Sequence, residues 1–209
     1  MLPSYIRFGS GSLNVYKKNP YNAYIEETAS KGKNIPCIFL SHRSVDKDAC
    51  RKIAQYLENI GVYYYLDEED IELQNADRAE QHQKVTECIQ KGIEKSTHMM
   101  CILSKTSLES VWIPFEIGYA YSILQVMKNN NLSILTLEDL SESTLPAYLE
   151  IATPIKGEKS FINYIEALTK KTKYSPSMMM ALHYCDSLQR PQAAAKKRST
   201  LKGILNQHK

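Results

Sequence analysis

Short apolar runs of strand length alternate with stretches of helical periodicity along the middle of this chain, and this alternation restricts the folds open to it. The runs cover residues 35–41, 62–66, 98–104 and 132–137. They are apolar throughout rather than at every second position, which is typical of strands buried on both faces. Strands joined by helical crossovers lie parallel in one sheet. The sequence therefore predicts an α/β fold with an open parallel sheet.

Three helices are expected to connect these strands. The first covers residues 49–60, where apolar residues recur at helical spacing and Gly61 follows as a stop signal. The second spans about 85–93 and the third about 112–127. The alternation of apolar runs and helical spacing continues to about Leu168.

Length, cysteines and hydropathy are those of a cytoplasmic protein. The 209 residues suffice for one domain with additions. No apolar run approaches the about 18 residues of a membrane span, and the first thirty residues lack the pattern of a secretion signal. The five cysteines are odd in number and widely spaced, which predicts buried thiols and no metal clip.

Charge is unevenly distributed along the chain. Residues 189–209 contain six basic residues and no acid, so this tail carries +6 and residues 1–188 carry −3, which together give the net +3. A basic tail can contact nucleic acid, but this one has no aromatic residues to interleave with bases and no nucleic-acid motif. We expect a solvated tail and no nucleic-acid partner.

Polar residues follow three of the expected strands directly. They are residues 41–44 after the first run, 67–70 after the second and 104–107 after the third. In open α/β sheets, ligands bind beyond the carboxyl ends of the strands, where the strand order reverses. These three segments are therefore expected to surround a binding site.

The segment from Ser104 to Gly118 carries the sharpest chemical signal. Trp112 and Glu116 are four residues apart and share a helical face, and Pro114 fits only the first turn of a helix. The helix dipole favours an ionised carboxylate there. An indole beside a fixed carboxylate suits a nucleotide ribose, although Glu116 could also be a solvated acid that complements the dipole.

With these residues the chain resembles the TIR domain family, the Toll/interleukin-1 receptor and resistance-protein module. The matching pieces are Ile38–Lys47, Gly61–Asp67, Ile102–Ser104 and the Ser-x-Trp-x-x-x-Glu pattern at 110–116. The likeness covers residues 34–168, which leaves residues 1–33 as an N-terminal extension and 169–209 as a helical, basic C-terminal extension. It implies a flavodoxin-like three-layer sandwich with a central parallel sheet of about five strands.

The resemblance also implies an activity. Many TIR domains cleave NAD+ and release nicotinamide, with a catalytic glutamate placed like Glu116, and they need no metal or cofactor. The products are ADP-ribose, a cyclic isomer or an ADP-ribose conjugate. Contacts to the substrate are expected from Trp112, His42, Arg43, Ser44, Asp67 and Ser104.

Structural roles remain open for most of these residues. Ser44 or Asp46 could cap the first helix, and Asp67 could order its own loop. Arg43 could be an ordinary surface residue. Trp112 could be a core aromatic beneath its helix.

The family likeness further implies partners. The charged connection from Asp67 to about Glu80 corresponds to the BB loop, which mediates packing between TIR domains, so a homo-oligomer is expected. A small TIR protein of this kind is similar to the signal-making component of Thoeris-type antiphage systems. That likeness implies a phage-derived activator and a separate effector that responds to the nucleotide product.

Two other functions stay open. A TIR scaffold that assembles without turnover would not need Glu116. A nucleoside deoxyribosyltransferase-like enzyme would act on nucleosides and ignore NAD+.

Overall fold

The computed structural model describes residues 35–125, 131–137, 140 and 145–171, together with the isolated positions Ile25 and Thr28. The predicted N-terminal extension therefore lies almost wholly outside the described residues. Most of the predicted C-terminal extension does as well, including Cys185 and the whole basic tail.

A parallel sheet of five strands forms the centre of the domain, in the order β2-β1-β3-β4-β5. The strands are β1 (Cys37–Ser41), β2 (Tyr63–Tyr65), β3 (His98–Leu103), β4 (Leu132–Thr136) and β5 (Thr153–Lys156). The first four coincide with the four apolar runs, which confirms the predicted parallel sheet. The fifth has no such run, because Ile155 is its only buried residue.

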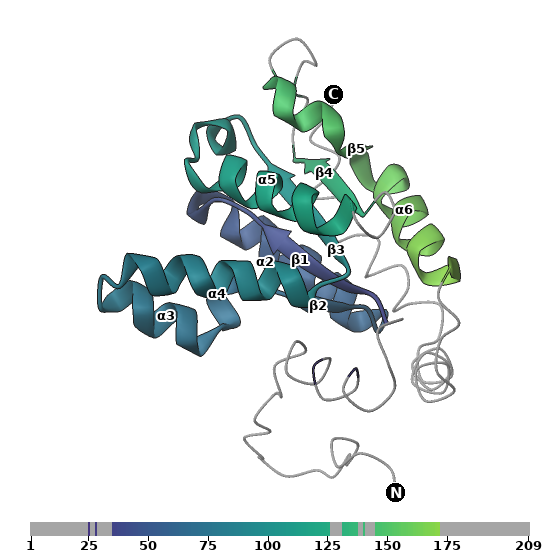
Figure 1. The fold of residues 1–209 in the computed structure, drawn as a ribbon. Coiled ribbons are helices and arrows are strands. Elements are labelled where there is room, and N and C mark those ends of the chain that lie inside the picture. Colours follow the sequence, from purple (N-terminus) through teal and green to yellow (C-terminus); the bar gives the residue numbers. More distant parts are fainter. Residues whose placement is uncertain are drawn as a thin grey trace, which may run out of the picture.

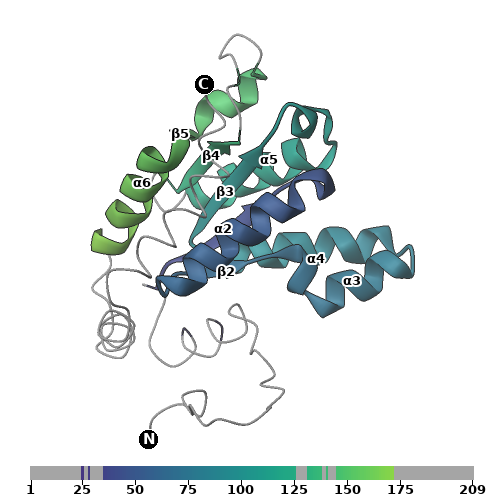
Figure 2. The same cartoon turned by 180° about the vertical axis from the view of Figure 1, so that it is seen from behind.

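Helices cover both faces of the sheet and complete the three layers of a flavodoxin-like fold. The helices are α2 (Lys47–Asn59), α3 (Ile71–Arg78), α4 (His82–Lys95), α5 (Trp112–Gln125) and α6 (Gly157–Lys171). Figure 1 looks onto the face that carries α4 and α5, and Figure 2 onto the opposite face with α2 and α6. Each face has its own hydrophobic cluster, one around α4 and α5 and one around α2 and α6.

The end of α2 follows from one glycine. Gly61 adopts a φ of 76°, a conformation that suits a residue without a Cβ. Its amide donates to the carbonyl of Glu58, and the amide of Val62 donates to the carbonyl of Leu57, which is the Schellman arrangement. The predicted stop signal at Gly61 is confirmed.

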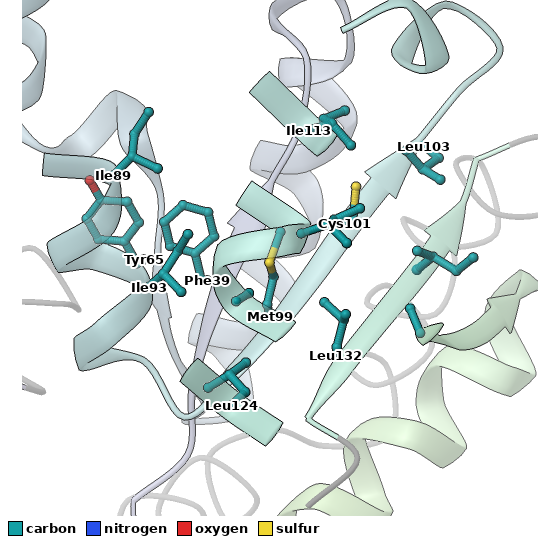
Figure 3. Packing of buried hydrophobic residues seen from close by; sticks show 14 of the residues in the cluster. Phe39, Tyr65, Ile89, Ile93, Met99, Cys101, Leu103, Ile113, Leu124 and Leu132 are labelled. Carbon is teal, nitrogen blue, oxygen red and sulfur yellow. The ribbon is translucent and has the colours of Figure 1, made fainter. Parts of the chain in front are cut away.

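Close packing of α4 on the sheet fixes the position of that helix. Phe39 and Tyr65, from neighbouring strands, stack with ring centroids 5.0 Å apart (Figure 3). A Cβ placed on Gly92 of α4 would come within 2.9 Å of the Tyr65 ring. The helix approaches the strands this closely because position 92 has no side chain.

The connection after β2 differs from the predicted long loop. Residues 67–80 contain a short 3-10 helix, η2 (Asp67–Glu69), and then the helix α3. Asp70 caps α3, because its Oδ1 accepts from the amide of Leu73 at 3.1 Å, while its Oδ2 accepts from the Tyr65 hydroxyl at 2.8 Å. Asp70 is one of several acidic residues in this segment, so its capping role depends on a contact that the sequence does not show.

The four described cysteines are free and buried, as predicted from their apolar surroundings. Within the described ranges, none of the helices has the length and hydropathy needed to cross a membrane.

Candidate functional site at the carboxyl ends of β1 and β3

The strand order reverses between β1 and β3, and Ser41 lies at that point. It is the last residue of β1 and pairs in register with Cys101 of β3. Side chains alternate between the two faces of a strand, so Ser41 shares the face of Phe39, which packs in the cluster around α4 and α5. The end of β1 thus directs a hydroxyl toward the helix that follows β3.

Glu116 accepts a hydrogen bond from the Ser41 hydroxyl. The Ser41 Oγ donates to the Glu116 Oε2 at 2.5 Å, and the Glu116 residue is only 8% exposed. The helix α5 begins at Trp112 with Pro114 in its first turn, as the sequence predicted, and the Ser110 Oγ accepts from its first amides. The alternative of a solvated surface acid is wrong.

Burial changes the acidity of this carboxyl. Burial is the largest cause that raises the pKa of Glu116, the hydrogen bond from Ser41 lowers it, and the negative charge of Asp67 raises it, with a net result of about 7. From its position near the positive end of the helix dipole, Glu116 was expected to be ionised. Desolvation outweighs the dipole, so the group changes its charge close to neutral pH.

Trp112 is not a core aromatic, because it is 40% exposed. Its ring meets Phe115 edge-on at a centroid distance of 5.9 Å. Because Trp112 and Glu116 are four residues apart in α5, they lie on one face of the helix. The indole therefore offers an accessible apolar surface next to a buried carboxyl.

His42 and Arg43, which follow β1, contact different segments. The His42 side chain is 3% exposed, and its Nε2 lies 3.8 Å from Asp67 Oδ1 and 3.9 Å from Glu68 Oε1. Arg43 donates to the carbonyl of Thr106, and its Nη1 lies 3.2 Å from Glu109 Oε2. Arg43 is thus bound to the segment after β3 and is not a free surface cation.

Asp46 links the segments after β1 and β3. It precedes α2 but makes no capping bond with its side chain. Its Oδ2 instead accepts from the Ser104 hydroxyl at 2.8 Å and from the Ser107 hydroxyl. Helix capping is therefore the wrong explanation for Asp46, while Ser44 is exposed at the start of the 3-10 helix η1 (Ser44–Asp46).

Asp67 does order its own turn, as the structural alternative proposed. Its Oδ1 accepts from the amide of Glu68 at 2.8 Å, and its carbonyl accepts from the Gln74 side chain at 3.1 Å. The same carboxylate faces His42 and influences the pKa of Glu116. The two interpretations are therefore compatible.

The structure thus brings most of the predicted residues to one edge of the sheet. Glu116, His42 and Asp67 lie around the end of β1, while Ser104 donates to Asp46 and Arg43 donates to the carbonyl of Thr106. Among the residues that the structure describes, no group of three or more His, Cys, Asp or Glu is arranged to hold a metal ion.

Sequence reasoning did not assign a role to Ser41. The signal was present, because Ser41 is the polar residue that ends an otherwise apolar strand, on the same side as Phe39. What was missing was the position of α5 against that side of the sheet.

The strand order and the polar edge at its reversal define a flavodoxin-like α/β protein. A family model described as a TIR domain matches residues 38–176. The chain belongs to the TIR domain family.

Two relatives share part of the sequence. A protein of Cytobacillus dafuensis named "Putative cyclic ADP-D-ribose synthase TIR2" is 26% identical over 110 residues, which are 52% of this chain and 28% of the relative. A protein of Bacillus cereus (strain MSX-D12) named "Probable 3' cyclic ADP-D-ribose synthase ThsB'" is 28% identical over 88 residues, 42% of this chain and 45% of the relative. The matched regions span less than half the length of either relative.

Proposed function

We propose that this protein cleaves NAD+ at the bond between nicotinamide and ribose. The observation that carries the proposal is the buried Glu116 carboxyl, fixed by Ser41 where the strand order reverses. The names of the two relatives, which denote cyclic ADP-D-ribose synthases, support the same chemistry.

One carboxylate suffices for this reaction. The bond between the anomeric carbon and the ring nitrogen breaks, its electron pair stays with nicotinamide, and the cationic ring leaves as a neutral base. No general acid is needed, unlike in most glycosidases. The ionised Glu116 stabilises the positive charge that develops on the ribose.

The other residues are assigned to binding. The exposed indole of Trp112 stacks on the substrate, and His42 lines the site beside Asp67. Arg43 binds phosphate, for which it exchanges its contacts to Glu109 and the Thr106 carbonyl. Ser44 and Ser104 contribute polar contacts from the segments after β1 and β3.

The nucleophile that captures the ribosyl cation determines the product. Water gives ADP-ribose and a proton, a group of the same molecule gives a cyclic isomer, and an outside acceptor gives a conjugate. We propose a cyclic ADP-ribose isomer, in line with the names of the relatives. We further propose that it acts as a signal to a separate effector in antiphage defence, and that the protein assembles through contacts between TIR domains.

The test is nicotinamide release from NAD+ by the purified full chain, resolved by chromatography and mass spectrometry. Glu116→Gln removes the charge and keeps the shape, so we expect release to fall by about 100-fold or more. Glu150→Gln makes the same change at an exposed position of the 3-10 helix η5 (Ala147–Ile151) and should retain full release.

Equal release by wild type and Glu116→Gln would remove Glu116 from this role. A wild type that releases no nicotinamide, also at high protein concentration and with phage lysate, would favour the scaffold. Turnover of nucleosides in place of NAD+ would indicate a deoxyribosyltransferase-like enzyme.

A further inference from the structure

We propose that Ser41 is the positioning residue for the Glu116 carboxylate, an inference that rests on the proposed NAD+ cleavage. Ser41 is separated from Glu116 by 75 residues in sequence, and its side chain joins the end of β1 to α5. It would act through Glu116 and would not itself contact the reacting atoms.

The geometry leaves one carboxyl oxygen for the substrate. Ser41 donates to Oε2, and in the described part of the chain Oε1 accepts no hydrogen bond from protein. A carboxyl group held at one oxygen keeps a fixed orientation and presents the other. Such fixed placement of a charged group is what stabilisation of a developing charge requires.

The hydroxyl proton of Ser41 has two candidate acceptors, and the carboxylate is the stronger. The Ser41 Oγ lies 3.8 Å from the Cys101 Sγ and 2.5 Å from the Glu116 Oε2. Burial raises the pKa of the Cys101 thiol, which therefore stays protonated and is a weak acceptor. The single proton of Ser41 is directed to Glu116.

Backbone pairing holds Ser41 in place. Its strand is hydrogen-bonded on both sides, to β2 and to β3, and the residue is 2% exposed. A donor fixed in this way opposes the desolvation that favours the neutral acid, and keeps Glu116 ionised at a lower pH than burial alone would allow.

Ser41→Ala tests the proposal through the pH dependence of kcat/KM for nicotinamide release. The hydrogen bond from Ser41 lowers the pKa of Glu116, so its removal should move the acidic limb of the profile up by about one pH unit or more. The rate should fall about fivefold at pH 7 and recover at pH 9. Ser41→Thr retains a hydroxyl, so its pH profile of kcat/KM should match that of the wild type.

Ser133→Ala is the matched control. Ser133 is also a buried serine of a central strand, but its Oγ donates to the Met99 carbonyl and not to Glu116. Its profile should coincide with that of the wild type. Ser41→Cys, which preserves volume with a weak donor, replaces Ser41→Ala if the latter does not fold.

An unshifted acidic limb in Ser41→Ala, beside an inactive Glu116→Gln, would overturn the role of Ser41 and leave the proposed function intact. If the wild type does not release nicotinamide, the proposed function fails and Ser41 is tested by a ¹³C NMR titration of the Glu116 carboxyl, assigned with Glu116→Gln. A higher Glu116 pKa in Ser41→Ala supports the positioning role, whereas an equal pKa overturns it.

Discussion

Glu116 combines two properties that oppose each other in most proteins. It is buried, which favours the neutral acid, and the proposed chemistry needs its ionised form. Ser41 offsets part of this conflict by donating to the carboxylate. We expect the ionised Glu116 to lower the free energy of unfolding, because a site optimised for charge stabilisation is rarely optimal for folding.

The pH dependence of unfolding should reveal this loss. Burial raises the pKa of Glu116 from 4.5 to about 7, so between these values the folded state binds a proton that the unfolded state has lost. Stability therefore falls as pH rises from about 4.5 to about 7 and levels off above the folded-state pKa. We expect Glu116→Gln to unfold with a free energy near that of wild type at pH 4 and about 3 kcal/mol higher at pH 8.

Chemical denaturation at both pH values measures this difference, with Glu150→Gln as the control at an exposed position. A difference that does not grow between pH 4 and pH 8 would show that the Glu116 carboxyl is solvated in the folded protein.

The glycines of α4 and α5 differ in how closely other side chains approach them. Gly92 of α4 lies against the Tyr65 and Phe39 rings, whereas a Cβ at Gly118 of α5 would meet nothing within 4 Å. Alanine is a better helix former than glycine by about 1 kcal/mol. Alanine substitutions at the two positions therefore distinguish the effect of intrinsic helix propensity from the effect of packing.

Gly92→Ala is expected to destabilise the protein by about 1–2 kcal/mol. The added methyl group overpacks against Tyr65, whose hydroxyl is held by Asp70, and this strain exceeds the gain in helix propensity. Gly118→Ala should instead raise stability by up to about 1 kcal/mol. Thermal unfolding of both variants measures the contrast, and stabilisation by Gly92→Ala would contradict the close packing of α4.

The α3 segment shows where local patterns mislead. Its charged residues predicted a loop, and the helix is short and held from outside by Asp70, which joins it to Tyr65 of β2. Only Leu73 and Ala76 of α3 are buried. Two apolar contacts give too weak a periodicity to be recognised from sequence.

For the whole molecule, the described sheet and its two hydrophobic clusters are built between Cys37 and Leu168. The two described positions of the predicted N-terminal extension at 1–33, Ile25 and Thr28, belong to neither cluster. We therefore still expect the predicted domain at 34–168 to fold without the N-terminal extension.

Deleting residues 1–33 should therefore preserve cooperative unfolding and shift Tm by only a few degrees. Deleting residues 1–41 also removes β1, which pairs with β2 and β3, and should abolish folding. Circular dichroism during heating distinguishes the two outcomes. Loss of the transition in the shorter deletion would show that the extension is part of the folded domain.

The sequence by itself determined the first four strands, the end of α2 at Gly61 and the start of α5 at Trp112, because these depend on periodicity and spacing within a few residues. It also placed Glu116 correctly in that helix. Only the tertiary structure decided that Ser41 meets Glu116 and that the carboxyl is buried. Desolvation and a contact across 75 residues arise from the packing of α5 on the sheet, which no local pattern encodes.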